Sequence, residues 1–129
     1  MDQSALVTEQ VEAGAKFLDE FQKSYPVQAA FWLYGGEDGR WRLYIASEKI
    51  TDDNFDTAYG KAARVARKID DPWLDPFVVK LIRTDDRLAK AAVEVQRRYP
   101  RSGPAHFPGR LFGPGVEPVC LYPQPAATP

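Results

Sequence analysis

The chain has 129 residues, with 17 Lys and Arg side chains, 18 Asp and Glu side chains and a formal net charge of −1. This length suits one domain with an ordinary hydrophobic core, and a content of 44% hydrophobic and 27% charged residues excludes a wholly disordered chain. The sequence holds no apolar run of the roughly 18 residues that a membrane-spanning helix needs, so no membrane partner is predicted.

Cysteine and histidine usage limits the compartment and the metal chemistry. A single cysteine, Cys120, excludes an internal disulfide and favours a reducing cytoplasm. The N-terminal segment carries acids where a secretory signal carries bases, so secretion is not expected. Cys120 and His106 are the only residues of their types, too few for a structural zinc site, and no cofactor is predicted.

Charge and proline are distributed unevenly along the chain. Residues 1–60 carry 5 basic and 11 acidic side chains, whereas residues 61–129 carry 12 and 7. Residues 100–129 hold 8 of the 11 prolines, which exclude a long helix or a central strand there. We therefore predict an α/β core over residues 1–99 and a Pro/Gly-rich arm over residues 100–129 of the same domain, with a short strand near 116–122.

The N-terminal half predicts a helix and then a β-hairpin. Apolar residues at steps of three and four between Val7 and Tyr25 predict the helix, with Ser4 as its N-cap. The segment AAFWLYGGEDGRWRLYIAS has two aromatic and β-branched runs around a glycine-containing loop. This pattern indicates a hairpin in which Gly35 pairs with Arg40.

The next segments predict a helix, a strand and a further helix. The helix spans about residues 53–69, and DPFVVKLIRT reads as a buried strand. Thr84 is expected to cap the last helix, whose buried stripe runs from Leu88 to Tyr99. The order α-β-β-α-β-α-β predicts an α/β (α+β) single-domain sandwich. Its mixed sheet has three or four strands, with helices mainly on one face.

The hairpin AAFWLY…WRLYIAS and the following segment AYGKAARVARKI resemble a pattern found in small uncharacterised bacterial proteins. Those proteins share the order of helix, tryptophan-bearing hairpin, helix and strand. The resemblance spans residues 5–122 and implies a soluble bacterial fold. It implies no activity and no functional residue.

Two basic stripes are candidates for nucleic-acid contacts. Each predicted helix after the hairpin has bases opposite its apolar stripe, and two adjacent helices would present them as one basic face, the pattern expected for phosphate contacts. A solvated helix surface explains the same pattern. The candidate residues are Lys61, Arg64, Arg67, Lys68, Arg87, Lys90, Arg97, Arg98 and Arg101.

Two surfaces are candidates for contacts with a protein partner: the arm and the hairpin face that carries Phe31, Arg42 and Tyr44. The hairpin face is amphipathic, and a proline-rich arm loses little entropy when it orders on a partner. The candidate residues are Phe31, Arg42, Tyr44, Phe107, Leu111 and Phe112.

Catalytic constellations are weak in this sequence. A Cys120–His106 dyad is conceivable because both residues lie in the arm. The acidic clusters near residues 52–56, 70–75 and 85–86 fit helix caps and turns better than a metal site. We therefore expect a non-enzymatic interaction module or a subunit of an assembly, with a protein partner or homo-oligomer. A nucleic-acid-binding accessory is the alternative, and a small metal- or thiol-dependent enzyme comes third.

Overall fold

The computed structural model describes residues 6–35 and 39–123, and within them it forms three α-helices and a five-stranded mixed sheet. The helices are α1 (Thr8–Phe21), α2 (Phe55–Ile69) and α3 (Arg87–Arg98). The strands are β1 (Ala29–Gly35), β2 (Arg40–Ala46), β3 (Val79–Ile82), β4 (Ala105–Phe107) and β5 (Val119–Leu121). Two 3-10 turns, η1 (Pro76–Val78) and η2 (Gly109–Leu111), complete the order. The predicted mixed α/β class is confirmed.

The strands lie in the order β3-β2-β1-β5-β4. β1 and β2 form the predicted antiparallel hairpin, with Gly35 opposite Arg40. β2 and β3 are parallel, since α2 returns the chain between them. β5 pairs antiparallel with both β1 and β4. The sheet has five strands and not the predicted three or four. β4 was not predicted, because it has three residues between two prolines and is too short to give a periodic signal.

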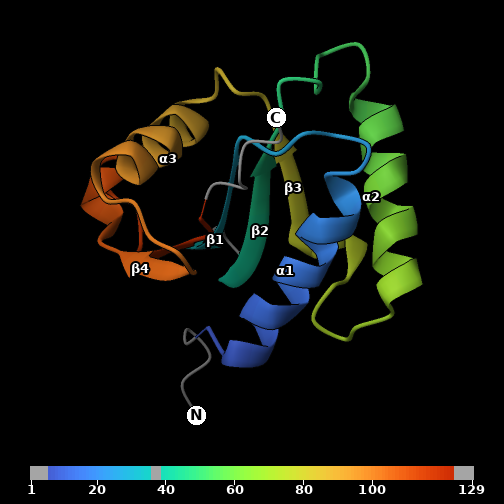
Figure 1. Cartoon of the computed structure of the whole chain (residues 1–129), viewed down its shortest axis with the longest axis horizontal. Coiled ribbons are helices and arrows are strands. Elements are labelled where there is room, and N and C mark those ends of the chain that lie inside the picture. Colours follow the sequence, from blue (N-terminus) through green and yellow to red (C-terminus); the bar gives the residue numbers. More distant parts are fainter. Residues whose placement is uncertain (1–5, 36–38, 124–129) are drawn as a thin grey trace.

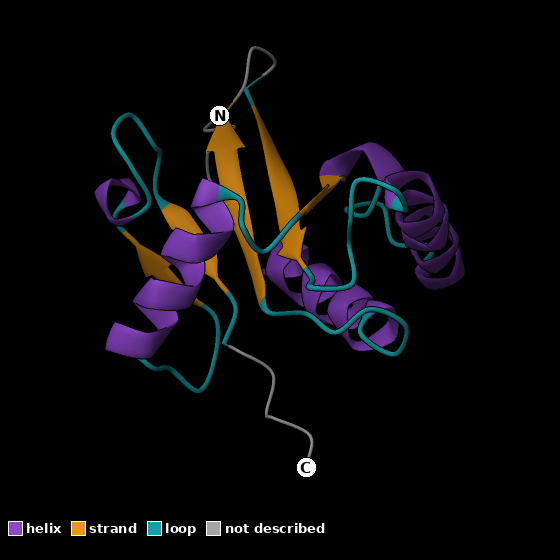
Figure 2. Cartoon of the chain, turned by 90° about the horizontal axis from the view of Figure 1, so that it is seen from above, coloured by secondary structure: helices purple, strands orange, loops and turns teal. Residues whose placement is uncertain are grey.

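Helices cover both faces of the sheet, as Figures 1 and 2 show. α1 and α2 pack on one face and α3 packs on the other. The prediction of helices mainly on one face thus holds for α1 and α2, while α3 adds a third layer. The physical reason lies in the central strand: neighbouring side chains Phe31 and Trp32 point to opposite faces and both have 0% exposure.

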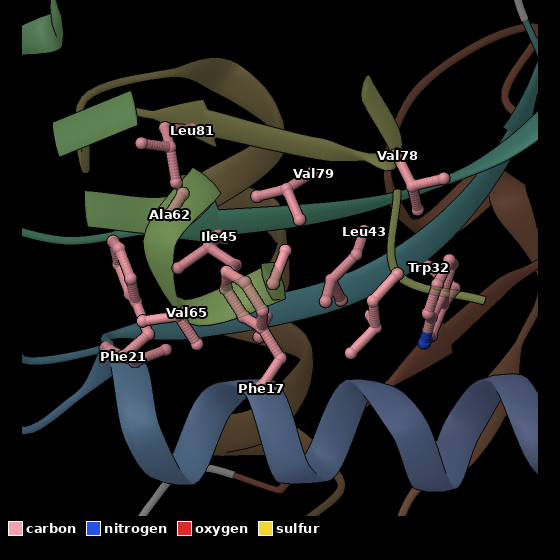
Figure 3. Packing of buried hydrophobic residues seen from close by; sticks show 14 of the residues in the cluster. Phe17, Phe21, Trp32, Leu43, Ile45, Ala62, Val65, Val78, Val79 and Leu81 are labelled. Carbon is pink, nitrogen blue, oxygen red and sulfur yellow. The ribbon is translucent and has the colours of Figure 1, made fainter. Parts of the chain in front are cut away.

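The larger core lies between the sheet and the α1–α2 pair. Trp32, Leu43 and Ile45 project from β1 and β2 toward Phe17 of α1 and Ala62 of α2 (Figure 3). The small residues of α2 let this helix approach the sheet closely. The hairpin face that carries Trp32, Leu43 and Ile45 is therefore part of the core.

The arm forms part of the sheet. β5 inserts between β1 and β4, and Phe112 after η2 is 2% exposed against Phe31, with ring centroids 5.7 Å apart. Residues 100–115, where no regular element was predicted, contain β4 and η2. The strand expected near 116–122 is confirmed as β5, over Val119–Leu121.

The helix ends differ in detail from their predicted caps. Ser4 lies outside the described residues. α2 begins at Phe55, two residues later than expected. Asp86, and not Thr84, caps α3, because its side chain accepts the Leu88 N–H at 2.8 Å. The stripe of α3 ends before Tyr99, which is 46% exposed.

Both edges of the sheet are protected against pairing with another strand. On β3 the Leu81 N–H donates to the Tyr59 hydroxyl of α2 at 2.9 Å, and Lys80 is exposed. On the other edge Pro104 and Pro108 flank β4. Short edge strands, lysine and proline are the usual devices against sheet extension. A partner is therefore expected to bind through side chains.

Candidate functional site

The basic residues predicted to contact nucleic acid do not form one surface. α2 and α3 lie on opposite faces of the sheet (Figure 1), so the expected joint basic face is wrong. The periodicity of each helix shows that it has a basic side, but not which face of the sheet the helix covers. Nucleic-acid binding by either helix alone stays a prediction.

Several of these cations are paired with acids of the same chain. Lys68 Nζ lies 3.1 Å from a carboxylate oxygen of Glu20 on α1. On α3, both Arg97 and Arg98 donate hydrogen bonds to Glu94. These two bonds lower the pKa of Glu94 to about 2. The positive charge that α3 offers near its C-terminal end is therefore partly compensated.

Most of the aromatic residues predicted to contact a partner lie inside the protein. Phe31, Phe112 and Phe107 have exposures of 0%, 2% and 8%. The ring of Phe31 stacks on that of Tyr44, with centroids 5.3 Å apart. This face of the hairpin is covered because α3 and the arm fold over it, so these rings stabilise the fold. Leu111 and Arg42 are half-buried at its margin.

The acidic cluster at residues 70–75 forms turns, and Asp86 of the 85–86 cluster caps α3. The 52–56 cluster does not cap α2, whose N-cap is Asn54 with no side-chain cap hydrogen bond. Asp71 accepts the Trp73 N–H at 2.9 Å, and Asp75 accepts the Phe77 N–H at 2.8 Å. No group of three or more metal-ligating side chains gathers in the described parts of the chain.

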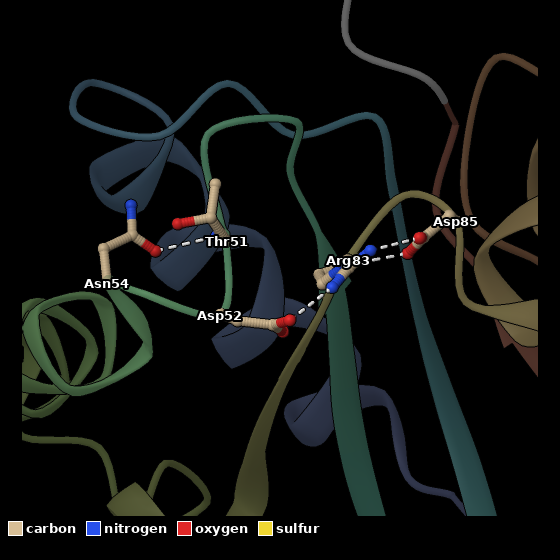
Figure 4. Close-up of polar contacts among 5 residues, drawn as sticks. All are labelled: Thr51, Asp52, Asn54, Arg83 and Asp85. Carbon is tan, nitrogen blue, oxygen red and sulfur yellow. Dashed lines mark hydrogen bonds and ion pairs between the residues drawn. The ribbon is translucent and has the colours of Figure 1, made fainter.

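Arg83 links two of the acidic clusters at the C-terminal ends of β2 and β3 (Figure 4). Its guanidinium lies 2.8 Å from Asp52 Oδ2 and also binds Asp85. Hydrogen bonds from Arg83 lower the pKa of Asp85. In sheets of this kind, ligands often bind where neighbouring parallel strands send the chain to opposite faces. Here the chain leaves β2 toward α2 on one face of the sheet and leaves β3 toward α3 on the other face. The Arg83 ion pairs join these two segments.

Cys120 and His106 are brought opposite each other on β5 and β4. Cys120 is 1% exposed, and burial raises the pKa of its thiol to about 11. His106 is exposed. A nucleophilic cysteine needs a lowered pKa and access to its substrate, so this arrangement does not suit thiol catalysis.

We expect iodoacetamide at pH 8 to alkylate native Cys120 at least about a hundredfold more slowly than the denatured chain, because the thiolate fraction falls with the raised pKa. Mass spectrometry over time measures both rates. His106→Ala is expected to leave the native rate unchanged. A marked slowing in that variant would show that the imidazole activates the thiol.

An exposed aromatic turn connects α2 to β3. Phe77 is 80% exposed and Trp73 is 41% exposed, while Leu74 and Val78 beside them are buried. Sequence reasoning missed this site, because it assigned DDPWLDP to an ordinary turn and the next residues to a buried strand. Aromatic and aliphatic residues alternate in this segment, and that pattern is compatible both with a buried strand and with an exposed turn.

No family model matches the chain, and neither the curated proteins nor the solved structures include a significant match. Among the described residues, no helix is both long and apolar enough to cross a membrane.

Proposed function

We propose that this protein is a non-enzymatic interaction module that pairs with a second copy of itself as a unit of an assembly. The contact surface is the aromatic turn, defined as residues 70–78, together with the C-terminal half of α2. The observation that carries the proposal is the 80% exposure of Phe77 beside the 41% exposure of Trp73. Large apolar side chains exposed together mark interaction sites.

Two side-chain hydrogen bonds and one buried leucine brace the aromatic turn. Asp71 and Asp75 accept the backbone N–H groups of Trp73 and Phe77. Leu74, 3% exposed, anchors the turn in the core. A preorganised turn loses little conformational entropy on binding, so more of the contact free energy appears as affinity.

The charges around the turn suit pairing with an identical surface. Arg64 and Arg67 are exposed on α2, and Asp70 is exposed directly after it. In the described part of the chain these three side chains form no ion pair. A two-fold axis brings the same surface of both copies face to face, so the arginines of one copy would meet Asp70 of the other. Both sheet edges are protected, which favours this side-chain contact over strand pairing.

Phe77→Ser is expected to weaken self-association at least tenfold. Each copy then loses the burial of one phenylalanine, worth about 1.5 kcal/mol or more. Sedimentation velocity from about 1 to 500 μM measures the monomer–dimer equilibrium. Val93→Ser on the opposite layer, where Val93 is 40% exposed, is the matched control and should change nothing. A wild-type chain that stays monomeric at the highest concentration contradicts the proposal.

A charge exchange tests the orientation of the two copies. Arg67→Glu alone and Asp70→Lys alone are each expected to weaken the dimer, because each creates two like-charge contacts. Mixing the two variants should restore a heterodimer, in which every contact is again between opposite charges. Circular dichroism checks that both variants are folded. Failure of the mixture to associate would reject the two-fold arrangement while leaving the Phe77 result standing.

A further inference from the structure

The solvent side of α3 carries a dense group of charged residues, which we call the basic face of α3. At 3.6 residues per turn, these residues fall within an arc of about 100° around the helix. The buried residues Ala89, Ala92 and Val95 lie on the opposite side, against the sheet. The residues of the basic face are Arg87, Lys90, Glu94, Arg97 and Arg98.

The basic face has a surplus of positive charge that the chain as a whole does not have. Four cations and one carboxylate leave it with a charge of +3, whereas the formal charge of the whole chain is −1. Glu94 accepts hydrogen bonds from both Arg97 and Arg98. Arg87 and Lys90 are exposed and form no ion pair with any residue that the structure describes. The surplus is therefore open to an anionic partner.

The length of the basic face indicates what kind of anion fits it. Arg87 in the first turn and Arg98 in the last turn are separated by about 16 Å along the helix axis, at 1.5 Å per residue. A small anion would contact one end of this row, whereas a linear polyanion contacts all of it. Three of the four cations are arginines, whose planar guanidinium groups bind phosphate oxygens in pairs. The face therefore suits a chain of phosphodiesters.

Tyr99 distinguishes a nucleic acid from other polyanions. It follows Arg98 directly at the end of α3 and is 46% exposed. The ring of Phe107 packs beside it, with centroids 6.1 Å apart, so the tyrosine ring is supported and still open to solvent. Arg101, also exposed, follows two residues later. An open aromatic ring beside arginines is the combination on which unpaired bases stack.

We propose that the basic face of α3, together with Tyr99, binds single-stranded nucleic acid. The phosphates lie along the cations of the helix, and one base stacks on the open part of the Tyr99 ring. A duplex keeps its bases inside and offers none to Tyr99. α3 covers the face of the sheet opposite α2 (Figure 1), so this binding is independent of the proposed self-association through the aromatic turn.

Fluorescence anisotropy of labelled oligothymidylate, titrated with the full chain at several salt concentrations, tests the proposal. We expect a Kd of about 10 μM or tighter at about 50 mM salt. Four phosphate contacts predict that log K falls against log salt with a slope of about −3. The absence of any anisotropy change at about 100 μM protein and low salt would reject nucleic-acid binding and leave the self-association proposal untouched.

A double variant locates the binding surface. Arg87→Gln with Lys90→Gln is expected to weaken binding about tenfold and to flatten the salt slope by about one unit or more. Lys16→Gln with Arg40→Gln is the matched control, because it removes the same charge from exposed positions outside the basic face. An equal loss of affinity in both double variants would show that binding follows net charge alone, and would overturn the assignment to α3.

A change at Tyr99 separates stacking from charge. Tyr99→Ala is expected to weaken oligothymidylate binding about fivefold or more and to leave the binding of inorganic polyphosphate, which has no bases, unchanged. Tyr99→Phe keeps the ring and is expected to rescue oligothymidylate binding. Equal losses for the two polyanions, or a duplex that binds as tightly as the single strand, would overturn the stacking role and the preference for single strands.

Discussion

Tyr122→Phe is expected to lower the free energy of unfolding by about 3 kcal/mol, because one hydroxyl joins α1 to the central strand. The Tyr122 hydroxyl accepts from Trp32 Nε1–H at 2.8 Å and donates to the Val11 carbonyl at 2.6 Å. Tyr122 is 5% exposed and Trp32 is 0% exposed. Removing the hydroxyl leaves the buried indole N–H of Trp32 without a partner, which costs about 1–3 kcal/mol, and the Val11 carbonyl keeps only its intrahelical bond, a loss of about 1 kcal/mol.

Chemical denaturation of Tyr122→Phe and wild type measures this loss. Tyr99→Phe is the matched control, since Tyr99 is exposed and its hydroxyl forms no hydrogen bond with any residue that the structure describes. In a Trp32→Phe background, Tyr122→Phe should cost less, because the indole donor is already gone. An equal cost in both backgrounds would show that the Trp32 bond contributes nothing to stability.

Gly109→Ala is the second change with a large expected effect, again about 3 kcal/mol of lost stability. A Cβ at Gly109 would lie 1.8 Å from the Val116 carbonyl oxygen and 2.5 Å from that of Glu117. Both neighbours are backbone atoms, so relief requires the chain itself to move. That chain leads within a few residues into β5, which sits between β1 and β4. The strain is therefore expected to reach the centre of the sheet.

Thermal unfolding followed by circular dichroism tests Gly109→Ala. We expect the midpoint to fall by roughly 10 °C. Gly103→Ala is the control in the same arm, because a Cβ there meets no atom within 4 Å. Similar midpoints for the two variants would show that the backbone at Val116 and Glu117 lies farther from Gly109 than it does in the structure.

Much of the fold follows from local patterns. The hairpin register with Gly35 opposite Arg40 was predictable, because strand alternation and loop length together leave one pairing that buries Trp32, Leu43 and Ile45 on one face. The three helices were likewise predictable from periodicity. Their caps were less so, since neighbouring Asp, Asn and Thr residues are nearly equivalent as caps, and Asp86 caps α3 instead of Thr84.

The candidate sites were much harder to predict than the fold. Phe31 and Phe112 were expected at a partner surface and are instead packed against each other. Phe77 was expected in a strand interior and is the most exposed large hydrophobic residue in the described chain. Buried and exposed aromatic rings belong to the same residue types, so the residue type does not distinguish them. Only the positions of α3 and the arm decide which rings are covered.

The element types, the hairpin register and the scarcity of catalytic side chains were predictable, because these features depend on residue identity and on spacings of a few residues. Long-range packing decided that α3 lies opposite α2, that the arm enters the sheet, and that Phe77 is exposed while Phe31 is buried. These features depend on contacts between residues far apart in the chain. Such contacts are selected by the burial of both faces of one sheet, which no local pattern encodes.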